Sequence, residues 1–371
     1  MSRRESTRVV VIGAGQAGLS VAYYLRRFAL EPGEDFRVLD RGPRAGGAWQ
    51  HRWEALRLGS AHRVNDLPGM DALGLSFATA DRERPAREVV TEYYQAYEEH
   101  YGLQVQRPVE VTAVTHEGAD LLVHGRTAEG PLELTTQVLV NATGTWGAPF
   151  VPWYPGADRF RGRQLTTASY RAAEELAGQD VVVVGGGTSA IGFVLELEGV
   201  AARTTWVSRG PIDFTDQEAL DPEAGAAAVA AQDRAAREGR ALPSIVSGTG
   251  VPKTRRIAAA LERGVLVARP MFDRIEEDGV RWAAARWQGP DAPDENGFLH
   301  ADAIIWATGF RPELRHLAPL HLREKAGGVR VENGAAWTDP RIFLAGYGPQ
   351  ASTIGASRAG RIVARQVIAL L

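Results

Sequence analysis

The chain has 371 residues, enough for two or three domains, and its 44% apolar and 23% charged content is typical of a folded, water-soluble protein. Its 42 basic and 45 acidic residues nearly balance, which argues against a nucleic-acid-binding protein. Because the sequence contains no cysteine, disulfides, zinc sites with cysteine ligands and the paired thiols of a disulfide reductase are excluded.

The other bulk features favour small-molecule partners. The eight histidines form no H-x-x-x-H pair, so we expect no metal site. No apolar stretch reaches the roughly 18 residues of a membrane span, and the apolar run near the N-terminus is too short for a signal peptide. We therefore expect a cytoplasmic protein with neither nucleic-acid nor membrane partners. A monomer and a homodimer are both compatible with the sequence.

The N-terminal segment predicts a βαβ unit. Val9 to Ile12 is a short apolar run, "GAGQAG" follows at 13–18, and residues 19–30 have apolar side chains at helical spacing. The apolar "FRVLD" at 36–40 then indicates a second buried strand. Strands connected through a helix in this way are parallel.

A second unit repeats this order 172 positions later. It has a valine strand at 181–184, a glycine turn, a helix ending near Glu198 and a strand at 204–209. The chain between the two units predicts one amphipathic helix and two β-rich stretches, at 87–102, 109–117 and 120–144.

Two patterns accompany the second unit. The alanine-rich segment 223–241 predicts a helix, which we expect to be solvated and without a site. Apolar strands end in Ala-Thr-Gly at 142–144 and again at 307–309. We interpret these strands as hinges, one before each crossover between two nucleotide-binding domains.

The glycine spacing of the first unit fits a dinucleotide. Gly13 allows a tight turn, Gly15 lets a pyrophosphate approach the backbone, and Gly18 permits close packing of helix on strand. The helix N-terminus presents free N–H groups to the phosphates. Asp40, 22 residues after Gly18, ends the second strand. Its carboxylate suits ribose hydroxyls and would repel a 2′-phosphate.

The second unit differs at the corresponding place. Gly185 and Gly187 form its turn, but its second strand ends in Ser208 and Arg209. Because a guanidinium pairs well with a 2′-phosphate, we expect NADPH here and a nucleotide without that phosphate in the first unit. Two dinucleotide sites suit a relay in which a nicotinamide gives its hydride to a flavin.

With these motifs, the sequence resembles the flavin-containing monooxygenases, including their compact bacterial members, over nearly its whole length. The resemblance is carried by "GAGQAG" with Asp40, "GGAWQHRWEALRLGS" (46–60), "NATGTWGAPFVPWYPG" (141–156), "GGGTSA" (185–190), "WATGFRP" (306–312) and "IFLAGYGPQASTIGASRAGRIVARQV" (342–367). It implies an α/β fold with two Rossmann-like dinucleotide-binding domains. Residues 1–165 and 299–371 would form the FAD-binding domain, and 166–298 an inserted NADPH-binding domain.

The resemblance also implies site residues. Gly46, Gly47 and Trp49 would line the flavin, and Gly346 with the segment up to Ser357 would reach its ring or ribityl chain. Further implied cofactor residues are Gly144, Thr188, Ser189, Thr308 and Gly309. The family fingerprint F-x-G-x-x-x-H-x-x-x-Y/F-K corresponds to Phe160, Gly162, Tyr170 and Arg171, with Thr166 in place of the histidine. This departure bears on how well the two domains are coupled.

The implied activity is that of an NADPH- and oxygen-dependent flavin monooxygenase. A C4a-peroxyflavin formed on FAD would oxygenate a soft nucleophile, an amine or a sulfide, of a small molecule. We expect Ser60 and Asn65, with His62 as an alternative, to hydrogen-bond the peroxide. Three alternatives stay open: Baeyer-Villiger oxygenation of a ketone, an NADPH-dependent flavin reductase or oxidase without oxygen insertion, and a non-catalytic flavin-binding protein.

Overall fold

The computed structural model describes residues 5–61, 64–216, 222–243, 250–283, 287–351 and 353–371. The chain divides into two compact units. The first unit comprises Met1–Gly147, Val229–Pro243 and Pro312–Leu371, and the second comprises Ala148–Ala228 and Ser244–Arg311. Each unit contains one of the two glycine turns, as the repeated pattern predicts.

The division differs from the expected boundaries at 165/166 and 298/299. Strand β15 (Ala303–Trp306) pairs in parallel with both β6 (Arg163–Thr166) and β7 (Asp180–Val184). This pairing places β6 and β15 in the sheet of the second unit, so the crossovers lie at 147/148 and 311/312 instead. These two crossovers each come within a few residues of an Ala-Thr-Gly turn, where the hinge strands were expected. The chain crosses twice more, at 228/229 and 243/244, within the range expected to belong to the NADPH-binding domain.

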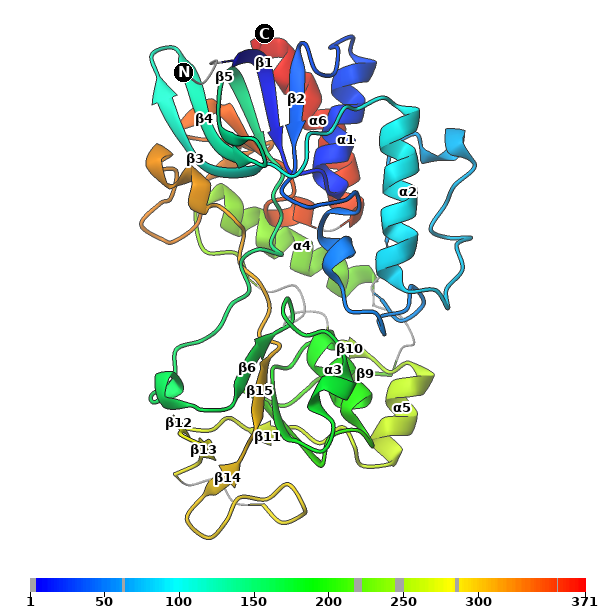
Figure 1. Ribbon diagram of the computed structural model, residues 1–371, viewed down its shortest axis with the longest axis vertical. Helices are drawn as coiled ribbons and strands as arrows, with labels where there is room; N and C mark the ends of the chain where they lie inside the picture. Colours follow the sequence, from blue (N-terminus) through cyan, green and yellow to red (C-terminus); the bar gives the residue numbers. More distant parts are fainter. Residues whose placement is uncertain (1–4, 62–63, 217–221, 244–249, 284–286, 352) are drawn as a thin grey trace. The chain divides into compact units, whose positions relative to one another are not determined.

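The first unit is built on an eight-stranded sheet with the order β16-β17-β18-β5-β1-β2, extended by β4 on β5 and β3 on β4. Figure 1 labels its strands β1 to β5. Its strands are β1 (Glu5–Ile12), β2 (Phe36–Leu39), β3 (Glu110–Glu117), β4 (Asp120–Thr127), β5 (Gly130–Asn141), β16 (Val331–Glu332), β17 (Ala335–Ala336) and β18 (Asp339–Leu344). Its helices are α1 (Gln16–Arg27), α2 (Ala86–His100) and α6 (Thr353–Leu370). β1 is parallel to β2 and to β5, which confirms the predicted βαβ unit.

The continuous apolar run of β1 is explained by burial on both faces. Val9 and Val11 pack with apolar residues of α1, α2 and α6, while Val10 and Ile12 pack with β3, β4 and β5 on the other face. Strands of parallel sheets covered on both sides lose the usual alternation of polar and apolar residues. Helices α1 and α6 lie side by side (Figure 1), and a Cβ on Gly360 would lie 2.6 Å from the Cβ of Ser20.

The second unit has a five-stranded parallel sheet with the order β11-β8-β7-β15-β6. Besides β6, β7 and β15 it contains α3 (Thr188–Leu197), β8 (Arg203–Ser208), β9 (Phe214–Thr215), β10 (Val251–Pro252), α5 (Arg255–Glu262), β11 (Arg269–Pro270), β12 (Arg274–Glu276), β13 (Gly279–Arg281) and β14 (Phe298–His300). Strands β12, β13 and β14 form a separate antiparallel sheet. The order β7, α3, β8 reproduces that of β1, α1, β2.

The alanine-rich segment forms helix α4 (Pro222–Arg237), as predicted. The expectation that it is solvated is wrong for its C-terminal part, where Ala235 and Ala236 are 0% and 1% exposed. Residues from Val229 onward belong to the first unit, and small alanine side chains allow close contact there. A Cβ on Gly348 would lie 3.1 Å from the Cβ of Ala236. Over the described ranges, every helix falls short of the length or apolar character required for a membrane span.

Candidate functional site

Two glycines of the first turn are required by the protein's own packing. Gly13 has a φ of +102°, and a Cβ there would lie 2.5 Å from the carbonyl oxygen of Ala142. A Cβ on Gly18 would lie 1.8 Å from the carbonyl oxygen of Gly13. These positions hold the turn against the end of β5, because only glycine lets the backbones approach so closely.

Gly15 is different, because nothing within the chain requires it. Its φ is −88°, which any residue adopts, and the atom closest to an added Cβ would be the Cα of Gly47 at 3.9 Å. Gly15 caps α1, whose first backbone N–H groups have no partners within the helix. The glycine therefore keeps open the space in front of a helix N-terminus, where a phosphate group binds well.

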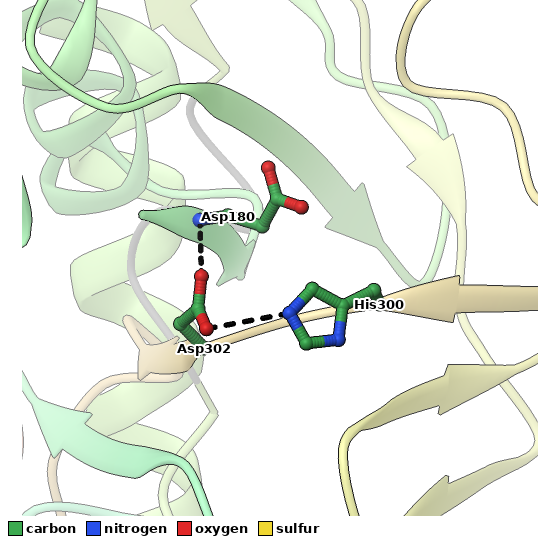
Figure 2. Close-up of side chains that lie close together, drawn as sticks. All are labelled: Asp180, His300 and Asp302. Atoms are coloured by element: carbon green, nitrogen blue, oxygen red, sulfur yellow. Dashed lines mark hydrogen bonds and ion pairs between the residues drawn. The ribbon is translucent and has the colours of Figure 1, made fainter. Parts of the chain in front are cut away.

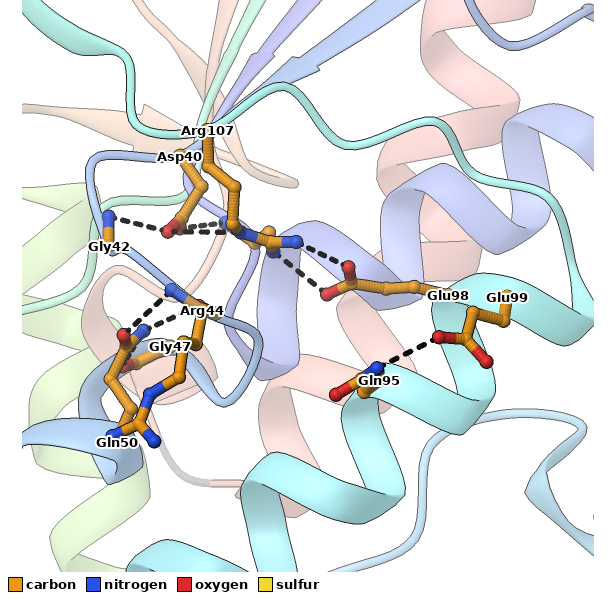
Figure 3. A network of polar contacts seen from close by, with 10 residues as sticks. Asp40, Gly42, Arg44, Gly47, Gln50, Gln95, Glu98, Glu99 and Arg107 are labelled. Carbon is orange, nitrogen blue, oxygen red and sulfur yellow. Dashed lines mark hydrogen bonds and ion pairs between the residues drawn. The ribbon is translucent and has the colours of Figure 1, made fainter. Parts of the chain in front are cut away.

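Asp40 lies beside this turn and is bound to it. Its carboxylate is buried and accepts hydrogen bonds from the backbone N–H groups of Ala14, at 2.7 Å, and Gly42, at 2.8 Å (Figure 3). The guanidinium of Arg107 lies 3.9 Å away and is itself held by Glu98 through bonds of 2.6 and 2.9 Å. A carboxylate offers about four acceptor positions, so Asp40 can still accept from ribose hydroxyls.

The segment after Asp40 folds back onto the turn. Gly47 has a φ of +51°, and a Cβ there would lie 2.6 Å from the Cα of Gly15. The amide of Gln50 donates to the carbonyl oxygens of Arg44, at 2.8 Å, and Gly47, at 3.1 Å, which fixes the loop (Figure 3). Trp49 is buried and belongs to a single-turn helix formed by Gly47–His51. The predicted residues Gly13, Gly15, Asp40 and Gly47 thus meet in one place.

A cavity of about 600 Å³ lies between this loop and α2. Its lining is mostly charged: Arg44, Arg87, Glu88, Thr91, Glu92, Gln95, Ala96 and Glu99. Pockets for small organic ligands are mainly apolar, so the lining argues against this cavity as the substrate site.

Gln16, which lies within the first glycine turn, forms hydrogen bonds to three distant segments of the chain. Its side-chain amide donates to the carbonyl oxygen of Asn65 and to Oγ of Ser357, both at 2.9 Å. Its amide oxygen accepts a short hydrogen bond from the hydroxyl of Tyr94 on α2. Because the carbonyl of Asn65 can only accept, the orientation of the amide is fixed.

The burial of Tyr94 and one further hydrogen bond stabilise these contacts of Gln16. Tyr94 is fully buried, and burial raises the pKa of its hydroxyl far above the usual value, so the group remains a donor. Ser357 in turn donates to the carbonyl oxygen of Asp66 at 3.3 Å. Sequence reasoning missed Gln16 because it occupies an unspecified position of the glycine fingerprint, and its partners lie up to 341 positions away.

The second glycine turn repeats the backbone contacts of the first. Gly185 has a φ of +142°, and a Cβ there would lie 2.3 Å from the carbonyl oxygen of Ala307. A Cβ on Gly13 would approach the carbonyl oxygen of Ala142 in the same way. The N–H of Gly185 donates to Val207 at 2.9 Å, and that of Gly13 to Leu39 at 2.7 Å. Each Ala-Thr-Gly turn thus lies against the glycine turn of its own unit.

The strand register places Ser208 where the first unit has Asp40. Val207 pairs with Val184 as Leu39 pairs with Ile12. The residue that follows is Ser208 in the second unit and Asp40 in the first. Ser208 is buried and its hydroxyl donates to the carbonyl oxygen of Gly210. Arg209 is exposed. The carboxylate that would repel a 2′-phosphate is replaced here by a hydroxyl next to a cation.

The other implied residues occupy varied places. Gly187 caps α3, and Thr188 and Ser189 begin it, whereas Gly144 and Gly309 have positive φ and open space around an added Cβ. The Thr308 hydroxyl donates to the carbonyl of Phe150. Gly346 lies close to α1, since its Cβ would be 3.2 Å from that of Ala17.

The two expected catalytic residues differ in their surroundings. Ser60 is exposed and its hydroxyl donates to the carbonyl of Arg57 at 3.1 Å. Asn65 is half-buried and tied to the first turn through Gln16. The structure therefore brings Asn65, but not the Ser60 hydroxyl, into contact with the site. His62 lies outside the described residues.

One group of side chains has the composition of a metal site. Asp180, His300 and Asp302 lie close together in the second unit (Figure 2). However, Asp180 is bonded to the guanidinium of Arg203 at 2.6 Å, and Asp302 accepts from the N–H of Asp180 at 2.8 Å. The first bond fastens the start of β7 to β8 and the second fastens it to the turn before β15, and the arginine already supplies the positive charge.

Comparisons with known proteins agree with this geometry. A family model described as pyridine nucleotide-disulphide oxidoreductase matches residues 10–224. A solved double mutant of the flavin monooxygenase from Stenotrophomonas maltophilia is 33% identical, with a TM-score of 0.77 over 98% of this chain and 99% of that one.

Two curated relatives match over a shorter region. The uncharacterized oxidoreductase CzcO of Bacillus velezensis is 29% identical over 55% of this chain and 56% of its own length. A Baeyer-Villiger monooxygenase of Streptomyces coelicolor is 33% identical over 56% of this chain and 38% of its own length. The match thus spans about half the length of these curated relatives, or less. Together, the match of the family model, the full-length likeness and the two glycine turns show that the chain belongs to the pyridine nucleotide-disulphide oxidoreductase family, among its flavin-containing monooxygenases.

Proposed function

We propose that the protein is an NADPH- and oxygen-dependent flavin monooxygenase that oxygenates a soft nucleophile, an amine or a sulfide, of a small molecule. FAD binds to the first unit and NADPH to the second. The observation that carries the proposal is the open space at Gly15, directly in front of α1 and beside the Asp40 carboxylate. The name of the S. maltophilia relative supports the same reaction class.

The first unit fits FAD. Gly15 leaves room for a pyrophosphate at the N-terminus of α1, where backbone N–H groups and the helix dipole favour an anion. Asp40 is held rigidly by Ala14 and Gly42 and retains acceptor positions for ribose hydroxyls. Gly47 and Trp49 follow on the segment that touches Gly15 and supply apolar surface for the flavin.

The second unit fits NADPH. Its turn has the backbone contacts of the first, so the pyrophosphate site is repeated at the N-terminus of α3. In place of the carboxylate stands Ser208, and the exposed guanidinium of Arg209 is available to a 2′-phosphate.

A bound flavin would supply hydride acceptance and oxygen activation, which is chemistry that amino-acid side chains do not supply. The chain's own residues bind and orient the two coenzymes. Asn65 is held by Gln16 beside the first turn, so we assign it, rather than Ser60, to the catalytic hydrogen bond.

A flavin reductase or oxidase is the second candidate. Thr166 stands where the family fingerprint has histidine, and it ends β6, where its N–H donates to Oγ of Ser169 at 2.8 Å. A threonine lacks the imidazole of that histidine, so transfer of electrons without insertion of oxygen is the outcome that this substitution favours.

The decisive experiment follows both electrons and oxygen. The purified full-length protein is expected to be yellow, and NADPH should bleach its flavin absorbance without air. Admission of ¹⁸O₂ with an amine or sulfide should then give a product containing one labelled atom. Hydrogen peroxide without labelled product would identify the reductase or oxidase, and a flavin that NADPH fails to bleach would identify a non-catalytic binding protein.

The junction at Gln16 provides a separate test of the flavin site. Tyr94→Phe removes the hydroxyl that holds the Gln16 amide, and we expect the dissociation constant for FAD to rise about fivefold, since a buried hydrogen bond contributes roughly 1 kcal/mol. Fluorescence of FAD released on dilution measures this constant.

Tyr97→Phe is the matched control for this variant. Tyr97 is equally buried on α2, but its hydroxyl donates to the carbonyl of Pro68 at 2.8 Å. We expect a similar loss of thermal stability with FAD affinity unchanged. Equal effects of both variants on FAD affinity would contradict a specific role for Tyr94.

A further inference from the structure

Arg52 lies between two tryptophans of the first unit. Its guanidinium carbon is 5.4 Å from the ring centroid of Trp49 and 4.2 Å from that of Trp146. Both distances are typical of cation–π contacts. One tryptophan belongs to the segment that touches Gly15, and the other follows the Ala-Thr-Gly turn that lies against Gly13.

Arg52 has no counter-charge within the part of the chain that the structure describes. Its Nε is buried without a hydrogen-bond partner. Arg37 and Arg107 also have a buried, unbonded Nε, but Glu5 and Glu98 bind their other nitrogens. Burial alone lowers the pKa of Arg52 to about 10, with no carboxylate to oppose the effect.

A buried guanidinium without a counter-charge destabilises the folded state. Removing a charge from water without pairing it is strongly unfavourable, and stacking on aromatic rings recovers only part of the loss. A ligand with negative charge would restore the balance, and the planar guanidinium is suited to bind such a group through two parallel hydrogen bonds. Arg52 is partly exposed, so a ligand can reach it.

The surroundings indicate which ligand this is. Trp49 is two residues from Gly47, whose backbone contacts Gly15, and Trp146 is four residues from Ala142, whose carbonyl contacts Gly13. The cation is therefore built onto the two segments that enclose the first glycine turn. Arg52 is thus positioned to pair with a negative charge of a ligand bound at the first glycine turn.

We propose that Arg52 binds an anionic group of the coenzyme of the first unit, either the pyrophosphate of FAD or the flavin ring in its negatively charged reduced form. This inference rests on the proposed function, which assigns FAD to that unit. It adds a binding residue that lies outside the glycine fingerprint and the Asp40 contact.

The test compares Arg52→Met with Arg52→Lys in the full-length protein. Arg52→Met removes a buried charge that has no partner, so the thermal midpoint of the flavin-free protein should rise. Affinity should nevertheless fall by about 10- to 100-fold. The fall should appear with oxidised FAD if Arg52 binds the pyrophosphate, and with reduced FAD if it binds the anionic ring. Arg52→Lys keeps the charge but not the planar geometry, and its affinity should lie between those of the wild type and Arg52→Met.

Arg269→Met is the matched control. Arg269 lies 5.4 Å from the ring centroid of Trp287, like Arg52 and Trp49, but it is paired with Asp291 at 2.7 Å and belongs to the second unit. Its loss leaves Asp291 without a partner, so the thermal midpoint should fall and FAD affinity should stay within about twofold of the wild type.

Two measurements separate the two anions. If Arg52 binds the pyrophosphate, Arg52→Met weakens binding of oxidised FAD and competition by ADP to the same degree and leaves the flavin midpoint potential unchanged. If it binds the reduced ring, the potential falls and competition by ADP is unchanged. Wild-type values for FAD affinity, ADP competition and potential would overturn the inference, as would a lowered thermal midpoint of the flavin-free protein. A wild-type protein that binds no FAD would overturn the proposed function as well.

Discussion

Gly15→Ala should abolish most FAD binding while leaving the first unit folded. The added methyl group would meet no atom of the chain closer than 3.9 Å, and the backbone at this position is already in a region that alanine adopts. The methyl group would instead occupy the space that a pyrophosphate needs. We expect FAD affinity to fall by about 10- to 100-fold, a range typical of an overfilled contact. Titration of the flavin-free protein with FAD measures it.

Two other glycines show whether the effect is specific. Gly18→Ala would place a methyl group 1.8 Å from the carbonyl oxygen of Gly13, so this variant should lose several kcal/mol of stability or fail to fold. Gly192 lies inside α3 with no contact to an added Cβ, and Gly192→Ala should gain roughly 0.5–1 kcal/mol without affecting FAD. Normal FAD affinity in Gly15→Ala would contradict the assignment of FAD to the first turn.

Arg209→Ala should change the choice between the two nicotinamide coenzymes. A hydrogen-bonded charge pair with a phosphate contributes about 1.5–3 kcal/mol, so the KM for NADPH should rise about 10- to 100-fold, with that for NADH nearly unchanged. Steady-state oxidation of each coenzyme, followed by absorbance, gives both constants.

Arg41 provides the matched control for Arg209, because it occupies the same register position in the first unit and interacts with Glu313 at 3.8 Å. Arg41→Ala should leave the ratio of the two KM values as in the wild type. If Arg209→Ala raised both KM values equally, its assignment to the 2′-phosphate would be wrong.

The repeated βαβ pattern was predictable from sequence because each part of it is local. A short valine run, glycines at fixed spacing and a strand ending in Asp40 or Ser208 are all contained within about 30 residues. Steric limits on the backbone act at this range, and the strands, helices and parallel pairing follow the prediction. The unit boundaries were harder, since the pairing of β6 with β15 joins segments 140 positions apart and has no local signal.

The polar contacts of the site depend on residues far apart in sequence even more than the unit boundaries do. Gln16 meets Ser357, and Arg52 meets Trp146, only because separate segments converge on the first turn. Nothing in the neighbouring sequence distinguishes Arg52 from a solvated arginine. For Ser60 the local sequence was misleading. Its place in a family motif predicted a catalytic hydroxyl, whereas the hydroxyl donates to the carbonyl of Arg57 in a local turn.

The contacts of the Ala-Thr-Gly turns restrict how the coenzyme preference of this protein can be engineered. The carbonyl oxygens of Ala142 and Ala307 lie where side chains would begin on Gly13 and Gly185, so any altered turn must keep glycine at both positions. The residues just beyond β2 and β8 carry no such restriction in the backbone. Because Arg41 and Arg209 are the same residue type, the two units differ at these positions only in Asp40 and Ser208, so the preference for or against a 2′-phosphate should be accessible by exchanging this one side chain.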